Sequence, residues 1–467
     1  MVKLRVLAFV NHIPIKYDLE PAIDRAMGWG IDYVVAQGTG KDWGPHWLGS
    51  GRQFPVTNFM ENVRPYLRVC HELKVPFIFS AGIAGARPQL AECLAGFSQV
   101  CREQGYSFDV GVAAGDIDRD YLKRRIKAGA HARRMDDHPV LAPELREEDV
   151  DASSYVVAQM GPEPVMALLD EGVDGVITGR SLDVGLYMAA ARRAGVSWGT
   201  AALLGKMVEC AGVALFPGDP SLPVYAEVHD DESIVLRSPS DRAQPTVYSC
   251  AGHSLYERMN PFREENTNGY LDLEGVRWED TGDGGVRVTG ARYVQTPYTV
   301  KVEGAGPIGY RAVNLSAVRE PRYIKYLPET AERIKQEVRD APRFSALAEG
   351  SDYFLNVTLF GRDAVLGDAE PRRGEEHEVG VLLDVVAPTE EIARDICYFA
   401  SISLQIGPYP GRRTSAGNVA QRFTQMTNPT GQAYRWTIWH LLPLEDPLEP
   451  FERFRVQFPY EEGKQPW

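Results

Sequence analysis

The first half of the chain alternates short apolar runs with amphipathic stretches, and this alternation limits the possible folds more than any other feature. Residues 4–10 form an apolar run interrupted only by Arg5, as expected of a strand covered on both faces. The same reading predicts further strands at 33–36, 76–80, 108–112, 155–158 and 173–178. Helices are predicted at 21–27, 63–73, 90–103, 121–130, 164–171, 184–194 and 201–211. This order predicts an α/β domain with a mostly parallel sheet and helices on both faces.

The pattern changes near Pro217. From 224 to 311, short alternating runs such as VYAEV and SIVLR are separated by turn formers such as TGDGG, which predicts antiparallel β structure. Helices are predicted again at 321–340 and 390–404, with strands at 353–359, at 378–386 and in the tail FERFRVQF. A chain of 467 residues exceeds the usual size of one core. We therefore predict an α/β domain at 1–222, a β-rich lobe at 223–320 and a small α+β C-terminal domain at 321–467.

Charge and cysteine usage restrict the partners and the compartment. The net charge of −14 argues against nucleic acid as a partner, because phosphate binding needs a basic face. The same negative charge gives no long-range attraction for an anion, so a pocket for an acidic metabolite must attract it through groups close to the ligand. The six cysteines include no CxxC pair, so free thiols in a reducing, cytoplasmic setting are expected. No apolar stretch approaches the roughly 18 residues of a membrane helix. A homo-oligomer is expected.

Glycine and polar residues follow nearly every predicted parallel strand. Ligands bind at the carboxyl ends of such strands, so these positions predict a site on one edge of the sheet. The residues expected to contact the substrate there are Gln37, Ser80, Gly82, Gln159, Gly161 and Thr178. Glycine is also common in the turns of any α/β protein, so each segment alone is weak evidence. No GxGxxG fingerprint or Walker loop occurs, so no nucleotide cofactor is indicated.

Arg180 is the strongest single feature, because it directly follows a predicted buried strand in the segment TGRSLDVG. An unpaired charge at such a position is costly. Its guanidinium could clamp a carboxylate or phosphate through two parallel hydrogen bonds. Alternatively, it forms an internal salt bridge with Asp183 or Glu209.

Several titratable side chains are candidates for acid–base catalysis. They are the carboxylates Asp116 and Asp183 and the imidazoles His12 and His253, the latter at a predicted turn after a strand; His46 is a further histidine candidate. Asp116 and Asp118 with Asp42 offer oxygen ligands for a divalent metal. Carboxylates at helix starts are more often caps, and single histidines are more often structural. The cofactor is thus unknown, with a divalent metal possible.

The C-terminal segment GPYPGRRTSAGN contains Arg412 and Arg413 on a glycine-flanked turn after the predicted helix at 390–404. Guanidinium and hydroxyl groups both donate hydrogen bonds to anions, so this turn is a second candidate for binding the acidic end of a substrate. A helix beginning in 419–426 would add its dipole. The alternative is an exposed basic turn that pairs with the acidic surface.

Four segments carry a family resemblance: VDGVITGRSLD (173–183), GKMVECAG (205–212), AGHSLYERMNPF (251–262) and YTVKVEGAGPIGYRAV (298–313). In order and spacing they resemble the acyclic terpene utilisation family of AtuA-like proteins, over roughly residues 1–325. The loop QGTGKDWGPHWLGSG departs from the commoner pattern of that family, which leaves the substrate open, whereas GPYPGRRTSAGNVAQ resembles its small accompanying domain. The resemblance implies catabolism of branched acids and acyl-CoA intermediates. It transfers no catalytic residues.

Together these features predict an enzyme. The leading hypothesis is a lyase, a hydratase or dehydratase, acting on a small hydroxy-carboxylic acid or its acyl-CoA thioester. Such chemistry needs an anion clamp, a base near an acidic C–H bond and a donor for the developing enolate. A hydrolase or isomerase at the same site, or a non-catalytic subunit that binds the acid or CoA, are the alternatives. A titratable group with a perturbed pKa beside the clamp would favour an enzyme.

Overall fold

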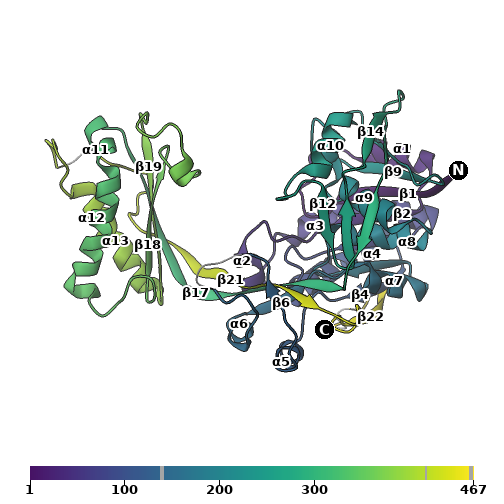
Figure 1. The fold of residues 1–467 in the computed structure, drawn as a ribbon, viewed down its shortest axis with the longest axis horizontal. Coiled ribbons are helices and arrows are strands. Elements are labelled where there is room, and N and C mark those ends of the chain that lie inside the picture. Colours follow the sequence, from purple (N-terminus) through teal and green to yellow (C-terminus); the bar gives the residue numbers. More distant parts are fainter. Residues whose placement is uncertain (137–140, 416–417, 462–465) are drawn as a thin grey trace. The chain divides into compact units, whose positions relative to one another are not determined.

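The computed structural model describes residues 1–136, 141–415, 418–461 and 466–467 (Figure 1). The chain forms two compact units, Met1–Gly306 with Trp436–Trp467, and Pro307–Arg435. This division differs from the one expected from composition at 222 and 320. Most strands predicted for the β-rich lobe lie in the first unit, and so does the C-terminal tail.

The first unit is built on a ten-stranded sheet. Its order is β14 (Arg277–Asp280), β15 (Val286–Thr289), β10 (Ile234–Arg237), β9 (Val224–His229), β1 (Val2–Val10), β2 (Tyr33–Gln37), β3 (Phe77–Ser80), β7 (Gly175–Thr178), β4 (Phe108–Ala113) and β22 (Arg453–Phe458). The pairs β1–β2, β2–β3, β3–β7 and β7–β4 are parallel. Antiparallel strands extend both edges. The α/β class is confirmed, but the sheet is mixed, because hairpins need no crossover helix to extend it.

Helices cover the parallel part of this sheet in two packed groups. One group is α1 (Glu20–Trp29), α3 (Val56–Leu73) and α4 (Arg87–Gln104); the other is α7 (Pro162–Asp170), α8 (Asp183–Arg193) and α9 (Trp198–Val208). The strand order reverses at β7, so right-handed crossovers place the two groups on opposite faces. The seven helices predicted between 21 and 211 are all present. Helix α3 begins seven residues before the predicted start at 63, so Pro65 lies inside it rather than in its first turn.

One predicted strand joins a different sheet. Strand β6 (Tyr155–Ala158) pairs antiparallel with residues 302–305 of β17 (Thr299–Val318), not with the parallel strands. The prediction that Gln159 follows a strand of the parallel sheet was therefore wrong. Bridges Asp116–Val157 and Met160–Ser181 nevertheless hold the end of β6 beside the loops that follow β4 and β7.

Shorter elements complete the first unit. They are α2 (Pro45–Ser50), α5 (Arg119–Lys127), β5 (Arg133–Arg134), α6 (Glu147–Asp151), β8 (Leu215–Phe216), β11 (Gln244–Pro245), α10 (Val247–Leu255) and the sheet β12 (Arg263–Asn266), β13 (Gly269–Asp272), β16 (Arg292–Gln295). His253 lies within helix α10 rather than at a turn after a strand. Thr246 caps this helix by accepting a hydrogen bond from the amide of Ser249.

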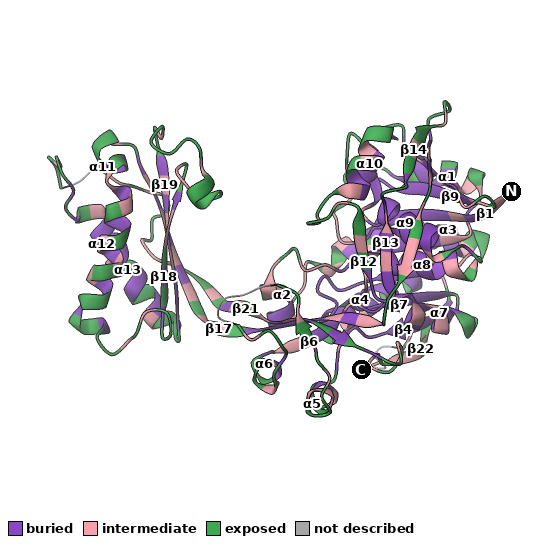
Figure 2. Cartoon of the chain, viewed as in Figure 1, coloured by how far each residue is buried: buried purple, intermediate pink, exposed green. Residues whose placement is uncertain are grey.

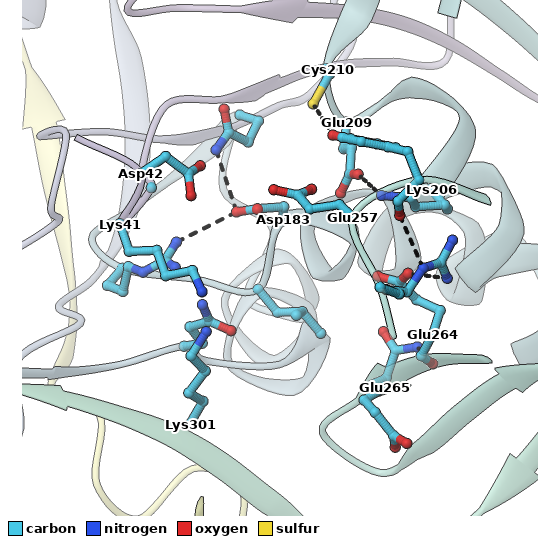
Figure 3. Close-up of a pocket in the computed structure, with 18 of the residues that line it drawn as sticks. Lys41, Asp42, Asp183, Lys206, Glu209, Cys210, Glu257, Glu264, Glu265 and Lys301 are labelled. Atoms are coloured by element: carbon cyan, nitrogen blue, oxygen red, sulfur yellow. Dashed lines mark hydrogen bonds and ion pairs between the residues drawn. The ribbon is translucent and has the colours of Figure 1, made fainter. Parts of the chain in front are cut away.

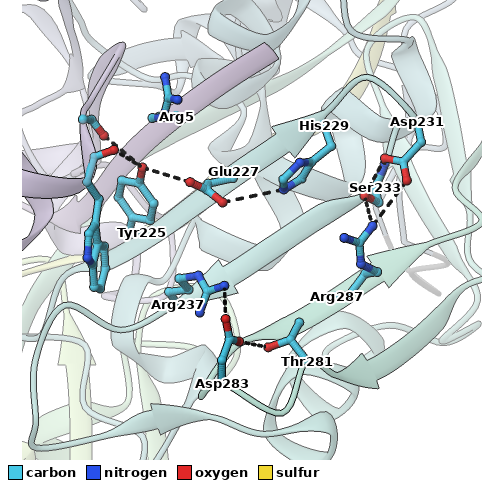
Figure 4. Close-up of polar contacts among 12 residues, drawn as sticks. Arg5, Tyr225, Glu227, His229, Asp231, Ser233, Arg237, Thr281, Asp283 and Arg287 are labelled. Carbon is cyan, nitrogen blue, oxygen red and sulfur yellow. Dashed lines mark hydrogen bonds and ion pairs between the residues drawn. The ribbon is translucent and has the colours of Figure 1, made fainter. Parts of the chain in front are cut away.

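One face of the antiparallel extension carries paired polar side chains (Figure 4). Arg237 donates to Asp283 at 2.8 Å, and Arg287 donates to Ser233 at 2.6 Å. Residues of the opposite face, such as Val228 and Leu236, are fully buried. The predicted alternation of apolar and polar positions is therefore present, as in an antiparallel sheet with one solvated face.

The second unit is an antiparallel sheet with helices packed on it. Strand β18 (Phe354–Phe360) pairs with β19 (Val379–Ala387), and β19 pairs with β17, which also pairs with β20 (Ala420–Gln421). Helices α11 (Pro321–Lys325), α12 (Leu327–Asp340) and α13 (Glu390–Ile406) bury their apolar faces with these strands (Figure 2). The helix expected from 419 is absent from described residues 418–426, because β20 pairs with β17 there and β21 (Asn428–Pro443) follows.

No helix among the described residues combines the length and apolarity needed to cross a membrane.

Candidate active site

A cavity of about 430 Å³ opens at the carboxyl ends of β1, β2 and β7 (Figure 3). Gln37 lines it from the last position of β2, and His12, Arg180 and Asp183 reach it from the segments that follow β1 and β7. Gln159 reaches it from the end of β6. The remaining wall comes from the end of α9, from the segment between α10 and β12, and from the start of β17. The cavity thus lies on the edge of the sheet where the sequence predicts a ligand.

The other predicted substrate contacts lie behind the cavity wall. Ser80 accepts the amide proton of Gly38 at 2.8 Å, and its carbonyl accepts a hydrogen bond from the Asn11 amide at 2.8 Å. Thr178 is buried and donates to Ser181 at 3.3 Å. These contacts fix the strand ends on which the cavity is built.

Two predicted glycines shape the backbone instead of lining the main cavity. Gly82 adopts φ +92° and lines a separate hollow of about 20 Å³. Gly161 begins α7, and a Cβ there would lie 2.4 Å from the Tyr298 hydroxyl. Both positions therefore need glycine for packing or conformation.

Arg180 is buried, with 2% of its surface exposed, and its guanidinium group forms two hydrogen bonds with Glu303. Its Nε donates to Oε2 at 2.9 Å and its Nη2 to Oε1 at 3.3 Å. Its Nη1 donates to the carbonyls of Thr39 and Ser181, both at 3.2 Å, and to Asp183 at 3.5 Å. The internal salt bridge predicted as the alternative is present, but its main partner is Glu303. Burial disfavours the charge, yet Glu303 and Asp183 raise the pKa of Arg180.

Lys301 lies beside this pair, with its Nζ 3.4 Å from a Glu303 oxygen and 4.0 Å from the centre of the Trp439 ring. The Nζ of Lys41 lies 4.2 Å from the centre of the same ring. Burial lowers the pKa of Lys301 to about 8; Glu303 opposes this, whereas Arg180 and Lys41 add to it. Lys301 is thus a lysine that can give up its proton near neutral pH.

Asp183 projects into the cavity between two groups of charges (Figure 3). Gln37 donates to its Oδ1 at 3.3 Å and also donates to the Thr39 carbonyl. Partial burial raises the pKa of the Asp183 carboxyl, although Arg180 and Gln37 act in the opposite direction. A raised pKa is one requirement of a general acid, so Asp183 is the candidate proton donor in the cavity.

The opposite wall holds a second charged group (Figure 3). Lys206 donates to Glu209 at 2.6 Å, and both side chains are less than a tenth exposed. Burial raises the pKa of Glu209 to about 8, with Lys206 opposing it. Arg258 pairs with Glu264 next to them.

The two predicted catalytic histidines differ in exposure, since His12 is half-buried and His253 is buried, but the pKa of each is lowered. His12 lines the cavity with its ring 5.7 Å from that of Trp43, and burial lowers its pKa to about 4. His253 stacks on Tyr256 behind the wall, and burial lowers its pKa to about 3. His46 lies in helix α2 and does not line the cavity. Neither His12 nor His253 is placed to titrate near neutral pH.

The predicted carboxylate metal site is not assembled. Asp42 lines the cavity, whereas Asp116 and Asp118 do not, and Asp118 caps helix α5 by accepting from Tyr121 at 2.6 Å. Within the described ranges, the group with metal-ligand geometry is Glu209, Cys210 and His253. Asp116 is largely buried, which raises its pKa to about 6.

The arginines of the C-terminal turn lie in the second unit. Arg412 donates to the carbonyls of Thr414 at 2.8 Å and Ser415 at 3.1 Å, and also to those of Ile406 and Gly407 at the end of α13. Its donors therefore satisfy backbone carbonyls, including those of a helix terminus. Arg413 is exposed. Anion binding by this turn remains a prediction.

Sequence reasoning missed Lys301 and Glu303, the residues that organise the site. A signal was present in the segment YTVKVEG, because positions two apart in a strand share a face. Two charged residues on one face, flanked by valines, indicate a strand that places charge inside the protein. Nothing in the sequence paired Glu303 with Arg180, which lies 123 positions away.

The site combines segments that also carry the family resemblance, since Arg180, Lys206, Tyr256 and Lys301 each come from a different one of the four. The model of the acyclic terpene utilisation family protein AtuA matches residues 53–431. The chain belongs to this family. The prediction from the four segments is confirmed, and the AtuA match continues beyond the expected end near 325. A search of curated proteins and a search of solved structures each found no match.

Proposed function

We propose that this AtuA-family protein is an enzyme, specifically a hydro-lyase that adds water to, or removes it from, a small carboxylic acid or its acyl-CoA thioester. The observation that carries the proposal is Lys301, a largely buried lysine with a pKa of about 8 that lines a charged cavity. A lysine of this kind is suited to act as a general base near neutral pH.

The proposed reaction uses Lys301 and Asp183 as an acid–base pair. In dehydration, neutral Lys301 takes the proton from the carbon next to the carbonyl. The C–H electron pair forms the double bond, the C–O bond to the hydroxyl breaks, and the leaving oxygen takes a proton from Asp183 to become water. The raised pKa of Asp183 supports its role as the acid, and the lowered pKa of Lys301 supports its role as the base.

Lys41 is the proposed contact for the acidic group of the substrate. It lines the cavity, and the described part of the chain shows no ion pair for it, whereas the fork of Arg180 is occupied by Glu303. This assigns Arg180 to holding Glu303 and the loop after β7 rather than to clamping the substrate. The presence of perturbed titratable groups beside a cation favours an enzyme over a carrier of acids.

The six free cysteines support a reducing, cytoplasmic setting.

The test screens hydroxy acids, their unsaturated counterparts and the matching CoA thioesters by thermal shift, then follows binders by mass spectrometry for gain or loss of one water. Lys301→Met should abolish interconversion and keep binding, whereas Lys335→Met, in the second unit, should behave as wild type. A compound that binds but is never converted would instead identify a binding subunit. Full turnover by Lys301→Met would refute the role of this lysine.

A further inference from the structure

Three potential metal ligands from two helices converge on one side of the cavity. Glu209 and Cys210 directly follow α9, and His253 lies in α10. One ligand atom from each lies within 4.8 Å of the other two. Glu209 and Cys210 line the cavity, and His253 lies behind them.

The imidazole of His253 is the observation that points to a ligand. The side chain is only 5% exposed, both ring nitrogens are buried without a hydrogen bond of normal geometry among the described residues, and the backbone of Lys206 makes a weaker contact with the ring. Burying polar atoms without partners is costly, so such groups normally have a partner. A nitrogen of this ring is one of the atoms in the converging group, so the ring is directed at the carboxylate and the thiol.

We propose that Glu209, Cys210 and His253 bind a divalent transition metal, with Zn²⁺ as the best match. One sulfur, one imidazole nitrogen and one carboxylate oxygen suit zinc, whereas calcium and magnesium prefer oxygen ligands alone. Three protein ligands leave a fourth tetrahedral position open. Because two of the ligands line the cavity, that position faces the cavity, where a water or an oxygen of a bound molecule can occupy it.

The surroundings require only a modest adjustment to bind the metal. Zinc bonds of about 2.0–2.3 Å place tetrahedral ligand atoms roughly 3.3–3.8 Å apart, so ligand atoms that lie within 4.8 Å of one another contract by at most about 1.5 Å. Lys206 occupies Oε1 of Glu209, and the second carboxylate oxygen remains for the metal. The Sγ of Cys210 lies 3.6 Å from the Tyr256 hydroxyl, and metal binding would release the thiol proton to solvent.

Metal titration of the full chain tests the proposal. The purified protein, stripped with a chelator, is titrated with Zn²⁺ by calorimetry and with Co²⁺ by absorption spectroscopy. We expect one equivalent of each metal to bind, with a thiolate-to-cobalt charge-transfer band. Cys210→Ser should remove that band and weaken Zn²⁺ affinity by at least about 100-fold, since even outer partners of metal ligands contribute 10–100-fold. Cys250→Ser, a buried thiol on helix α10, is the matched control and should keep both.

X-ray absorption of the zinc-loaded wild-type protein gives an answer that needs no variant to fold. The expected zinc shell holds one sulfur at about 2.3 Å, with nitrogen and oxygen in the other positions. No stoichiometric Zn²⁺ binding, a shell without sulfur, or a cobalt band that persists in Cys210→Ser would each overturn the proposal. The hydro-lyase proposal rests on Lys301 and Asp183 and is decided separately by the conversion assay.

Discussion

The titration of Lys301 offers the sharpest test of how this cavity is built. Its side chain is 13% exposed, and its pKa is lowered from 10.5 to about 8, first by burial and then by Arg180 and Lys41, against the pull of Glu303. This difference corresponds to about 3 kcal/mol against the charged form. Below pH 8 the neutral fraction should be roughly 300-fold larger than that of an ordinary lysine.

Competitive acetylation measures this directly. Trace acetic anhydride modifies only neutral amines, and mass spectrometry of the Lys301 peptide at increasing pH gives the midpoint. We expect a midpoint at about 8 in the wild type. Lys41→Met removes a repelling cation and should raise the midpoint, whereas Glu303→Gln removes an attracting carboxylate and should lower it further. A wild-type midpoint near 10.5, or shifts of the opposite sign, would refute this account of the cavity.

The same titration affects stability with a defined sign. The folded protein releases the Lys301 proton at about pH 8, whereas the unfolded chain keeps it up to about 10.5. The unfolded state therefore binds more protons in this interval, and the free energy of unfolding rises with pH across it. Relative to Lys301→Met, the wild type should gain up to about 3 kcal/mol between these limits, measured by urea unfolding at each pH.

Three further substitutions should change the stability of the protein in a predictable direction. Glu303→Gln should lower the urea midpoint, because it leaves Arg180 buried without its main partner at a cost of about 3–5 kcal/mol; an unchanged midpoint would show that solvent reaches the guanidinium. Asp116→Asn should raise the melting temperature above pH 6 but not at about pH 4. The folded protein binds the Asp116 proton more tightly than the unfolded chain does, so the stability of the wild type falls as pH rises to about 6. Gly115→Ala should be strongly destabilising in thermal unfolding, since its Cβ would lie 2.3 Å from the Arg180 amide, whereas Gly252→Ala, with open space around it in α10, should be neutral or better.

Local sequence patterns predict much of the fold. The apolar run at 4–10 and the strands that follow it were predictable, because a strand covered on both faces needs a continuous apolar stretch whatever its neighbours are. Helices α4 and α13 likewise follow from their own periodicity. The edge of the sheet that carries the cavity followed from the parallel order of the central strands.

Long-range pairing decided the rest. Only the tertiary structure could place β6 against β17 and β22 against β4. Backbone hydrogen-bonding groups are the same in every strand, so they do not specify which strand pairs with which. The same holds for the site. Arg180 was identifiable as a costly buried charge, but its partner was not, since a salt bridge depends on two side chains meeting in space and not on their separation in sequence. Lys301 owes its lowered pKa to burial and to Arg180 and Lys41, which come from two other segments, and burial exists only once the chain has folded.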